Sequence, residues 1–226
     1  MSEAESGALP PLRLYAYWRS SCSWRVRIAL EHKGLAYEVR SIHLREGEQR
    51  SDDYAGVNTL QQVPVLEWEE GALTRRLTQS LAILHFLEDA YPEKALVPAD
   101  AWARARAWEH AEIVNAGIQP LQNFATLLLV DSLGGDKVAH ARGVIAKGLG
   151  AMEKLAKETA GAYLVGDRPS VADVCLVPQL YNARRFDVDV DAYPTLLRAE
   201  ARCASLPAFQ AAHPDRQPDA PSAEPS

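Results

Sequence analysis

The spacing of apolar side chains divides the sequence into two parts with different periods. In residues 10–91, short apolar or alternating runs predict four strands, over residues 12–17, 37–42, 63–68 and 72–77. Apolar side chains at helical spacing predict two helices in the same part, over residues 22–33 and 79–90. Gly34 follows the first helix, where a left-handed glycine commonly ends one, and a polar loop is expected up to Gln62. The order of these elements predicts a small βαβ–ββα domain.

The second part carries only helical patterns. Residues 92–99 contain two prolines and indicate a linker, after which residues 100–212 are predicted to form an all-helical domain. Its helices are expected over residues 100–130, 136–160, 171–185 and 193–205. Ser170 and Asp173 have the spacing of a capping box, so we assign Asp173 to folding and not to catalysis. Residues 213–226 are rich in proline and are expected to be a mobile tail.

Pro64 stands at the start of a predicted strand, where it cannot donate a ladder hydrogen bond. A cis Val63–Pro64 bond would turn the backbone of Val63 outward, toward a ligand. Because X–Pro bonds are cis in only about 5% of cases, the pattern alone favours an ordinary trans proline on an edge strand.

Composition and charge narrow the classes of function. The 226 residues carry a net charge of -6, which argues against a general nucleic-acid binder. No apolar run approaches the ~20 residues that span a bilayer, and the opening stretch MSEAESGALPPL lacks the apolar core of a signal peptide. Three widely spaced cysteines form neither a disulfide framework nor a zinc set, and the six histidines show no metal-ligand spacing. We therefore expect a cytoplasmic protein that binds no metal, no membrane and no nucleic acid.

The entrance of the first predicted helix is the strongest candidate for chemistry. Ser20, Ser21 and Cys22 stand where unpaired N–H groups and the helix dipole favour an anion, and Arg19 and Arg25 add positive charge. This setting favours the thiolate form of a thiol held there. The thiol could belong to Cys22 or to a bound ligand, or the serines could serve only as helix caps. A dithiol redox site is not supported, because the third residue after Cys22 is Arg25.

Five motifs along the sequence are informative as a set. They are SSCSWRVRIAL at 20–30, QVPVL at 62–66, QSLAI at 79–83, GIQPLQN at 117–123 and VGDRPSVADVCLVPQ at 165–179. As a set they resemble the zeta class of glutathione transferases, over about residues 12–219. The resemblance implies the glutathione transferase fold: an α/β thioredoxin-like N-terminal domain that binds glutathione, plus an all-α C-terminal domain. It also implies a homodimer and a cis bond before Pro64.

The resemblance further implies a set of contacts with glutathione. They involve Ser20, Gln49, Val63, Pro64, Gln79, Ser80, Gln119 and Asn123. The backbone of Val63 would pair with the cysteinyl part of the tripeptide. Gln79 and Ser80 would hold the γ-glutamyl group, whose carboxylate suits a helix N-terminus. Gln49 matches a position near the glycyl end, and the last two residues, from the helical domain, would close over the site.

The activity that the resemblance implies is glutathione-dependent cis–trans isomerisation of maleylacetoacetate to fumarylacetoacetate, a step in tyrosine and phenylalanine breakdown. The catalytic residues would be Ser20, Ser21 and Cys22, and we expect Ser20 to provide the hydroxyl that faces the glutathione sulfur. Arg19 and Arg185 would grip the carboxylates of a small dicarboxylate enone substrate, because guanidinium matches carboxylate bidentately.

Other activities stay open for the same residues. Maleylpyruvate isomerase uses similar thiol chemistry on a similar diacid, and the resemblance also allows an α-halo acid glutathione transferase. A deglutathionylase would need Cys22 as its nucleophile. A protein of another class, a non-catalytic glutathione-fold interaction protein, is disfavoured by the intact SSC, VP and QS motifs.

Overall fold

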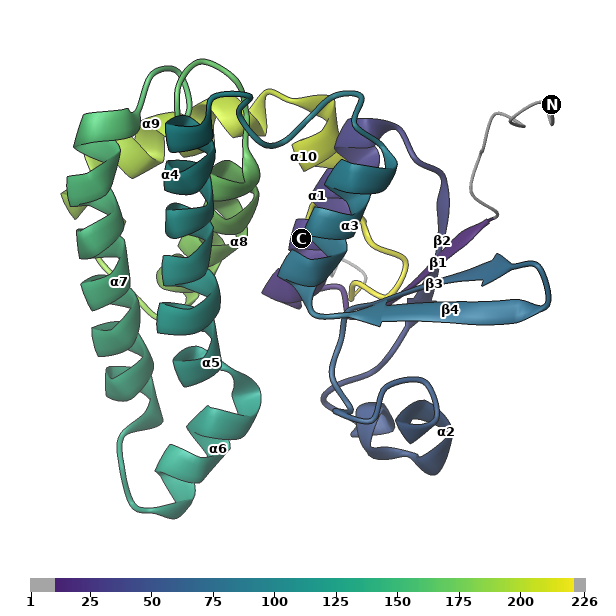
Figure 1. Cartoon of the computed structure of the whole chain (residues 1–226). Helices are drawn as coiled ribbons and strands as arrows, with labels where there is room; N and C mark the ends of the chain where they lie inside the picture. Colours follow the sequence, from purple (N-terminus) through teal and green to yellow (C-terminus); the bar gives the residue numbers. More distant parts are fainter. Residues whose placement is uncertain (1–10, 222–226) are drawn as a thin grey trace, which may run out of the picture. The chain divides into compact units, whose positions relative to one another are not determined.

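The computed structural model describes residues 11–221, which form two compact units (Figure 1). Described residues up to Leu87 and from Ala211 onward make up the first unit, and Glu88–Gln210 the second. The first unit contains a sheet of four strands, β1 (Leu12–Ala16), β2 (Tyr37–Ser41), β3 (Val65–Glu70) and β4 (Leu73–Thr78). The strand order is β2-β1-β3-β4, with β1 and β2 parallel and the other two pairings antiparallel. The predicted βαβ–ββα order is confirmed.

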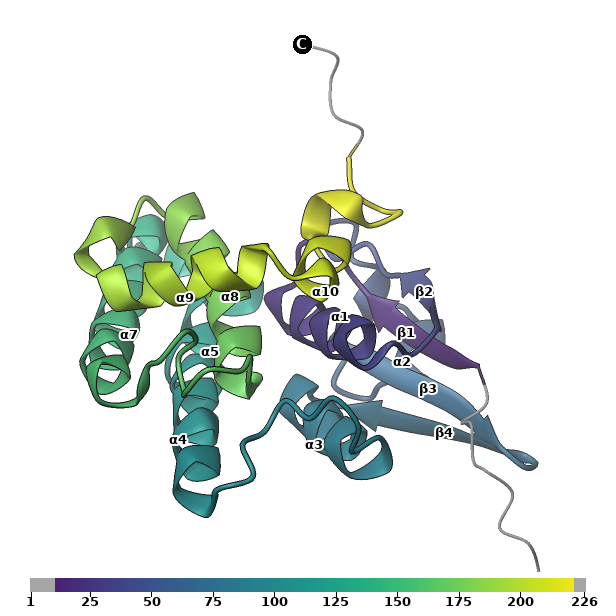
Figure 2. The same cartoon turned by 90° about the horizontal axis from the view of Figure 1, so that it is seen from above.

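Two helices, α1 (Ser21–Lys33) and α3 (Ser80–Ala90), lie on the same face of the sheet (Figures 1 and 2). Along β1, every second residue beginning with Leu12 is buried, so alternate side chains face the core. The ring of Trp68 in β3 stacks on Phe86 of α3, with 4.8 Å between the ring centroids. The core of this unit therefore lies between the sheet and these two helices.

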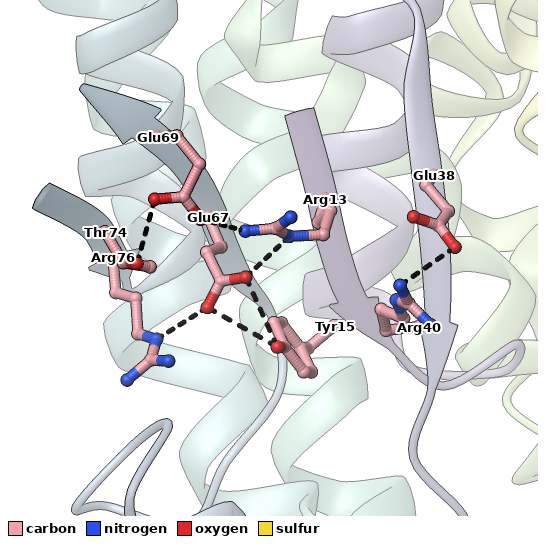
Figure 3. Close-up of polar contacts among 8 residues, drawn as sticks. All are labelled: Arg13, Tyr15, Glu38, Arg40, Glu67, Glu69, Thr74 and Arg76. Carbon is pink, nitrogen blue, oxygen red and sulfur yellow. Dashed lines mark hydrogen bonds and ion pairs between the residues drawn. The ribbon is translucent and has the colours of Figure 1, made fainter. Parts of the chain in front are cut away.

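A charged network crosses the opposite face of the sheet (Figure 3). Glu67 of β3 is the ladder partner of Arg13 in β1 and of Arg76 in β4. Each guanidinium donates its Nε–H to a different oxygen of the Glu67 carboxylate, at 2.6 Å. Burial by itself raises the pKa of Glu67, but the hydrogen bonds from Arg76 and Arg13 outweigh it and lower the pKa. One buried carboxylate thus connects three strands.

The loop between β2 and β3 contains two short helices that the sequence pattern did not predict. They are η1 (Glu48–Arg50) and α2 (Asp52–Ala55). Ser51 caps α2, because its hydroxyl oxygen accepts from the N–H of Tyr54 at 3.2 Å. The Tyr54 hydroxyl and the Asn58 amide both donate to the carbonyl of Gln62 at 2.8 Å. The expected polar loop is therefore an ordered segment.

The regular elements of the second unit are all helices, as predicted, apart from an isolated β-bridge between Ala160 and Gly166. Its elements are α4 (Ala101–Glu112), η2 (Ile113–Ile118), α5 (Gln119–Gln122), α6 (Phe124–Ser132), α7 (Lys137–Thr159), α8 (Val171–Arg185), η3 (Val190–Ala192), α9 (Pro194–Ala204) and α10 (Pro207–Ala211). Within residues 11–221, no single helix has the length and apolar content to cross a bilayer. The stretches Ala101–Gln122 and Phe124–Ser132 reach that threshold only when taken together, as a pair bent by 42°.

The prediction of one continuous helix over residues 100–130 is wrong. The α-helical pattern ends at Glu112, and Ile113–Ile118 winds as a π-helix. Pro120 has no N–H with which to continue a helical ladder, so it occurs at the start of the new helix α5. Asn123 has extended backbone and caps α6 by accepting from the N–H of Thr126 at 2.8 Å. These local effects interrupt a helix whose apolar spacing shows no break.

The capping role predicted for Asp173 is confirmed. Its carboxylate accepts from the Ser170 N–H at 2.9 Å, from the Ser170 hydroxyl at 3.0 Å and from the Leu164 N–H at 3.0 Å. Burial raises the pKa of Asp173 to about 6, although these hydrogen bonds oppose the shift. Asp173 therefore fixes the start of α8 and the loop before it.

Residues 213–221 differ from the mobile tail that their composition predicted. They contain η4 (Pro214–Arg216), and the buried Gln217 amide donates to the carbonyls of Ala211 and His213 at 3.2 and 2.9 Å. His213 meets the ring of Trp24 in α1 edge-on, with 5.3 Å between centroids. The segment is held by backbone and ring contacts, which its hydropathy does not reveal. Residue 10 and residues 222–226 of the expected domain and tail lie outside the described residues.

Candidate active site

The entrance of α1 forms a tight turn between β1 and the helix. The N–H of Ser20 donates to the carbonyl of Tyr17 at 3.0 Å, and α1 begins at Ser21. Ser20 is the N-cap, because its hydroxyl oxygen accepts from the N–H of Ser23 at 3.2 Å. The hydroxyl hydrogen is then available to donate to a ligand. The first turn of α1 contains no acidic residue, so the positive end of the helix dipole is not neutralised locally.

Ser21 and Cys22, at the first two positions of α1, are partly exposed. Cys22 is a free thiol. Arg19 lies in the turn, where its guanidinium packs over the Trp18 ring at 5.2 Å from the centroid. The structure therefore places the four predicted residues from Arg19 to Cys22 in one turn at a helix N-terminus, which is a setting that binds anions.

The start of α3 supplies a second anion-binding group in the same unit. Gln79 has a φ of 68°, which is uncommon for a residue other than glycine, and its carbonyl accepts from the N–H of Ile83 at 3.0 Å. Ser80 is only 4% exposed, and its hydroxyl oxygen accepts from Nη1 of the buried Arg25 at 3.1 Å. The Ser80 hydrogen must therefore point to another acceptor. Arg25 also places a positive charge behind this hydroxyl.

The bond between Val63 and Pro64 is cis, so the implication of the family resemblance is confirmed and the expectation from base rates is wrong. Gln49 lies in η1, where its Nε2 donates to the carbonyl of Leu44 at 3.3 Å. The Gln49 Oε1 atom is buried and has no hydrogen-bond partner within residues 11–221. The donor and acceptor groups of the first unit thus suit glutathione.

The other three predicted residues belong to the second unit. Gln119 is the first residue of α5, and Asn123 caps α6 through its side-chain oxygen. Arg185 ends α8, donates to Oδ1 of Asn182 at 2.9 Å and packs over the ring of Phe186 at 5.6 Å. The Asn123 oxygen is engaged in capping, so its amide N–H groups are the part of this side chain suited to a ligand.

Sequence reasoning missed several polar residues that hold these elements. Gln122 of α5 and Gln179 of α8 are both buried and exchange amide hydrogen bonds at 2.8 and 3.1 Å. Arg27 is fully buried inside α1, and Asp219 contacts the turn before that helix. Arg27 could have been identified from the sequence, because an arginine on the apolar face of a predicted helix indicates a buried charge with a structural role. The partners of the other residues are far away in the sequence, and no local pattern indicates them.

Comparisons with known proteins agree with this arrangement. Residues 19–90 match the profile of the glutathione S-transferase N-terminal domain, and residues 135–218 match that of the C-terminal domain. Probable maleylacetoacetate isomerase 2 of Drosophila melanogaster is 46% identical over 220 residues, which cover 96% of this chain and 94% of the relative.

Solved structures give the same result. The crystal structure of maleylacetoacetate isomerase from Anaeromyxobacter dehalogenans 2CP-1, with glutathione in its active site, has a TM-score of 0.88 and 52% identity. The match covers 95% of this chain and 100% of the Anaeromyxobacter chain. Another structure of that protein holds dicarboxyethyl glutathione and citrate in its active site. A zeta-class bacterial maleylpyruvate isomerase has a TM-score of 0.87 and 40% identity, covering 92% of this chain and 100% of that one. The chain therefore belongs to the glutathione S-transferase family, within the zeta class that includes the maleylacetoacetate isomerases.

Proposed function

We propose that this chain catalyses the glutathione-dependent cis–trans isomerisation of maleylacetoacetate to fumarylacetoacetate, in tyrosine and phenylalanine catabolism. The observation that carries the proposal is the run from Ser20 to Cys22 at the positive end of α1, in a chain whose relatives are named for this reaction. The ligands of the Anaeromyxobacter relative, glutathione and dicarboxyethyl glutathione, support a glutathione cofactor and a dicarboxylate substrate.

Six residues of the first unit, Ser20 among them, are assigned to glutathione binding. The Ser80 hydroxyl accepts from Arg25, so it can donate to the γ-glutamyl carboxylate at the N-terminus of α3. Gln79 borders the same group, and the backbone of Val63 pairs with the cysteinyl part. Gln49, in η1, is assigned to the glycyl end. Pro64, beside Val63, and Gln119 and Asn123 of the second unit complete the assignment.

Catalysis requires a double bond to become single for a moment. Bound glutathione supplies a thiolate, whose reversible addition to the conjugated alkene permits rotation before the thiolate leaves again. Ser20 donates its hydroxyl hydrogen to the sulfur, and the end of α1 favours the negative charge. Ser21 and Cys22 are the first two residues of α1, beside Ser20, and are assigned to catalysis with it. Arg19 and Arg185 bind the two substrate carboxylates and stabilise the negative charge that develops on the substrate oxygen.

The decisive experiment measures isomerisation of maleylacetoacetate with and without glutathione, for the wild type and for variants of the turn. Turnover should require glutathione. Ser20→Ala should lower kcat by about a hundredfold, a loss typical of removing one donor to a developing anion. Ser20→Asp retains a good helix cap but places a negative charge at the sulfur, so it should lower kcat at least as far without loss of stability. Equal turnover without glutathione would disprove the proposal.

Cys22 provides the control within the same turn. Cys22→Ala should reduce turnover far less than Ser20→Ala, because the thiol that reacts belongs to glutathione. A larger loss for Cys22→Ala would instead assign the nucleophile to the protein. In that case a deglutathionylase assay with Cys22→Ser would identify the activity.

Maleylpyruvate isomerisation is the second candidate, favoured by the 40% identity to a zeta-class enzyme of that name. The two substrates are both diacids with a cis enone, so the same turn serves either. Parallel measurement of kcat/KM for maleylacetoacetate and maleylpyruvate separates them, and a higher value for maleylpyruvate would replace the first assignment.

The proposed assembly is a homodimer in the cytoplasm. Large apolar side chains remain exposed in the second unit, among them Trp102 at 71%, and exposed apolar surface is typical of association sites. None of the described cysteines, which are Cys22, Cys175 and Cys203, forms a disulfide, and this suits a reducing compartment. Analytical ultracentrifugation should give a mass twice that of the 24.8 kDa chain.

A further inference from the structure

The C-terminal segment (residues 211–219) contacts the turn that precedes α1, and the proposed mechanism does not use these contacts. The Asp219 carboxylate accepts from the backbone N–H of Trp18 at 2.8 Å, across 201 positions of sequence. The edge-on contact of His213 with Trp24 lies in the same segment. Backbone N–H groups in a turn otherwise bond to water or to neighbours, so a carboxylate from so distant a position is a specific arrangement.

Arg27 joins the segment and the turn from inside the unit. Its side chain is fully buried, and it donates to the carbonyls of Trp18 at 2.8 Å and Tyr17 at 3.4 Å. The same guanidinium donates from Nε to the carbonyl of Ala212 at 3.2 Å. Burial lowers the pKa of Arg27 to about 10, so the group is still protonated at neutral pH. One buried charge therefore holds both pieces of backbone.

These contacts fix the backbone immediately before Ser20. Trp18 has its N–H bound by Asp219 and its carbonyl bound by Arg27. The Tyr17 carbonyl accepts from the N–H of Ser20 as well as from Arg27. The direction of the Ser20 hydroxyl thus depends on a turn whose geometry is set by residues distant in sequence. A displacement of about 1 Å in such a group costs up to a hundredfold in rate.

We infer that the C-terminal segment positions the Ser20 hydroxyl for catalysis, with Asp219 as the positioning residue that orients the turn through the Trp18 N–H. The inference rests on the proposed function, because it requires Ser20 to act on the thiolate of bound glutathione. The charged and titratable groups of this region come from three elements. Arg19 lies in the turn, Arg27 lies beneath it, and the ring of His43 contacts Tyr17. The C-terminal segment adds His213, Asp215, Arg216 and Asp219.

The test compares Asp219→Ala with Asp219→Asn, which retains an acceptor oxygen but loses the charge. We measure kcat, KM for glutathione, and the pKa of the enzyme-bound glutathione thiol from its ultraviolet thiolate absorbance. Asp219→Ala should lower kcat about tenfold and raise the thiol pKa, with little change in KM for glutathione. Asp219→Asn should recover most of both effects. Hydrogen–deuterium exchange of the turn should accelerate in Asp219→Ala only.

The sign of the thiol pKa shift separates positioning from a simple charge effect. If Asp219 acted only through its negative charge, both variants would lower the thiol pKa, because removing a nearby anion favours the thiolate. Asp215, whose side chain is 70% exposed in the same segment, provides the matched control, and Asp215→Ala should behave as wild type.

Equal behaviour of Asp219→Ala and Asp215→Ala would overturn the inference, and so would a lowered thiol pKa in both Asp219 variants. A wild-type enzyme without glutathione-dependent turnover would instead overturn the proposed function, so the two failures are distinct.

Discussion

Gly148 in α7 should not tolerate a methyl group, although the residue lies in a helix, where alanine is normally preferred. A Cβ at this position would lie 2.3 Å from Cγ1 and 2.4 Å from Cδ1 of Ile118. Ile118 is fully buried in the π-helical segment η2, and a closely packed interior offers its side chain no free space. Gly148→Ala therefore forces η2 and α7 apart or drives Ile118 out of its preferred rotamer.

The size of the destabilisation follows from comparison with Gly150, a second glycine of the same helix. A Cβ at Gly150 would meet no atom within 4 Å, so Gly150→Ala should stabilise the protein by up to about 1 kcal/mol through helix propensity. Gly148→Ala has the same gain, but it also has an overpacking cost of about 1–3 kcal/mol. The free energy of unfolding should therefore be lower for Gly148→Ala than for Gly150→Ala by about 1–3 kcal/mol.

Urea unfolding of the two variants measures this difference, and a double-mutant cycle with Ile118→Ala assigns its cause. Ile118→Ala alone should cost about 2–5 kcal/mol, because it leaves a cavity. In the Gly148→Ala background the same truncation removes both clashing atoms, so its cost should fall by the overpacking energy. Equal stability of Gly148→Ala and Gly150→Ala, or a cycle with no coupling, would refute the reasoning.

Two further predictions concern charge and pH. Glu67→Gln should lower the free energy of unfolding measured with urea at neutral pH, because the amide NH₂ must face one of two guanidinium groups. Glu70→Gln is the control and should change stability little, because Glu70 and its partner Arg75 are both more than half exposed. Since the pKa of Glu67 is lowered from 4.5, the wild-type advantage is present above that value and should shrink as pH falls below it; a constant gap would contradict this. Burial, helped by the charge of Arg106, lowers the pKa of His110 from 6.5 to about 4, so its contribution to stability is complete above pH 6.5 and is lost on acidification. Between about pH 7 and pH 4.5, the free energy of unfolding should therefore fall by roughly 2–3 kcal/mol less in His110→Gln than in the wild type. Urea unfolding at a series of pH values measures this difference, and parallel curves for the two proteins would rule it out.

The elements of the first unit could be predicted because local patterns determine them. Apolar periodicity predicts the strands and helices on either side of Gly34. The end of α1 follows from Gly34 itself, which has the left-handed conformation expected of a C-terminal glycine, with a φ of 73°. The cis bond at Pro64 could not be predicted from local pattern, since local sequence favours trans, and it was available only through family resemblance. The short helices after Glu48 span three and four residues, too few for a period to be visible.

The interruption of the predicted helix at residues 100–130 has a different origin. Apolar residues continue at compatible spacing through η2 and α5, and Pro120 is compatible with the first turn of a helix as well as with a break. The capping hydrogen bond of Asn123 separates α5 from α6, and asparagine in a helical pattern does not by itself indicate that bond.

The candidate site divides along the same line. The turn from Arg19 to Cys22 and the start of α3 were predicted because motif residues cluster at two helix N-termini. The support from Arg27 and Asp219 was missed, because hydrogen bonds to backbone carbonyls and N–H groups across such a sequence separation leave no periodic signal.

The order of synthesis gives the C-terminal segment another consequence. Residues from Ala211 onward complete the first unit but are translated only after the whole of Glu88–Gln210. On the ribosome, the sheet and its helices can therefore collapse early. The Trp18 N–H gains its hydrogen bond to Asp219 only after the C-terminal segment has been synthesised. The second unit can fold before the turn at Ser20 acquires its final geometry. A released chain truncated before residue 211 should therefore retain the sheet and the helical unit but lose at least the tenfold in kcat expected for Asp219→Ala.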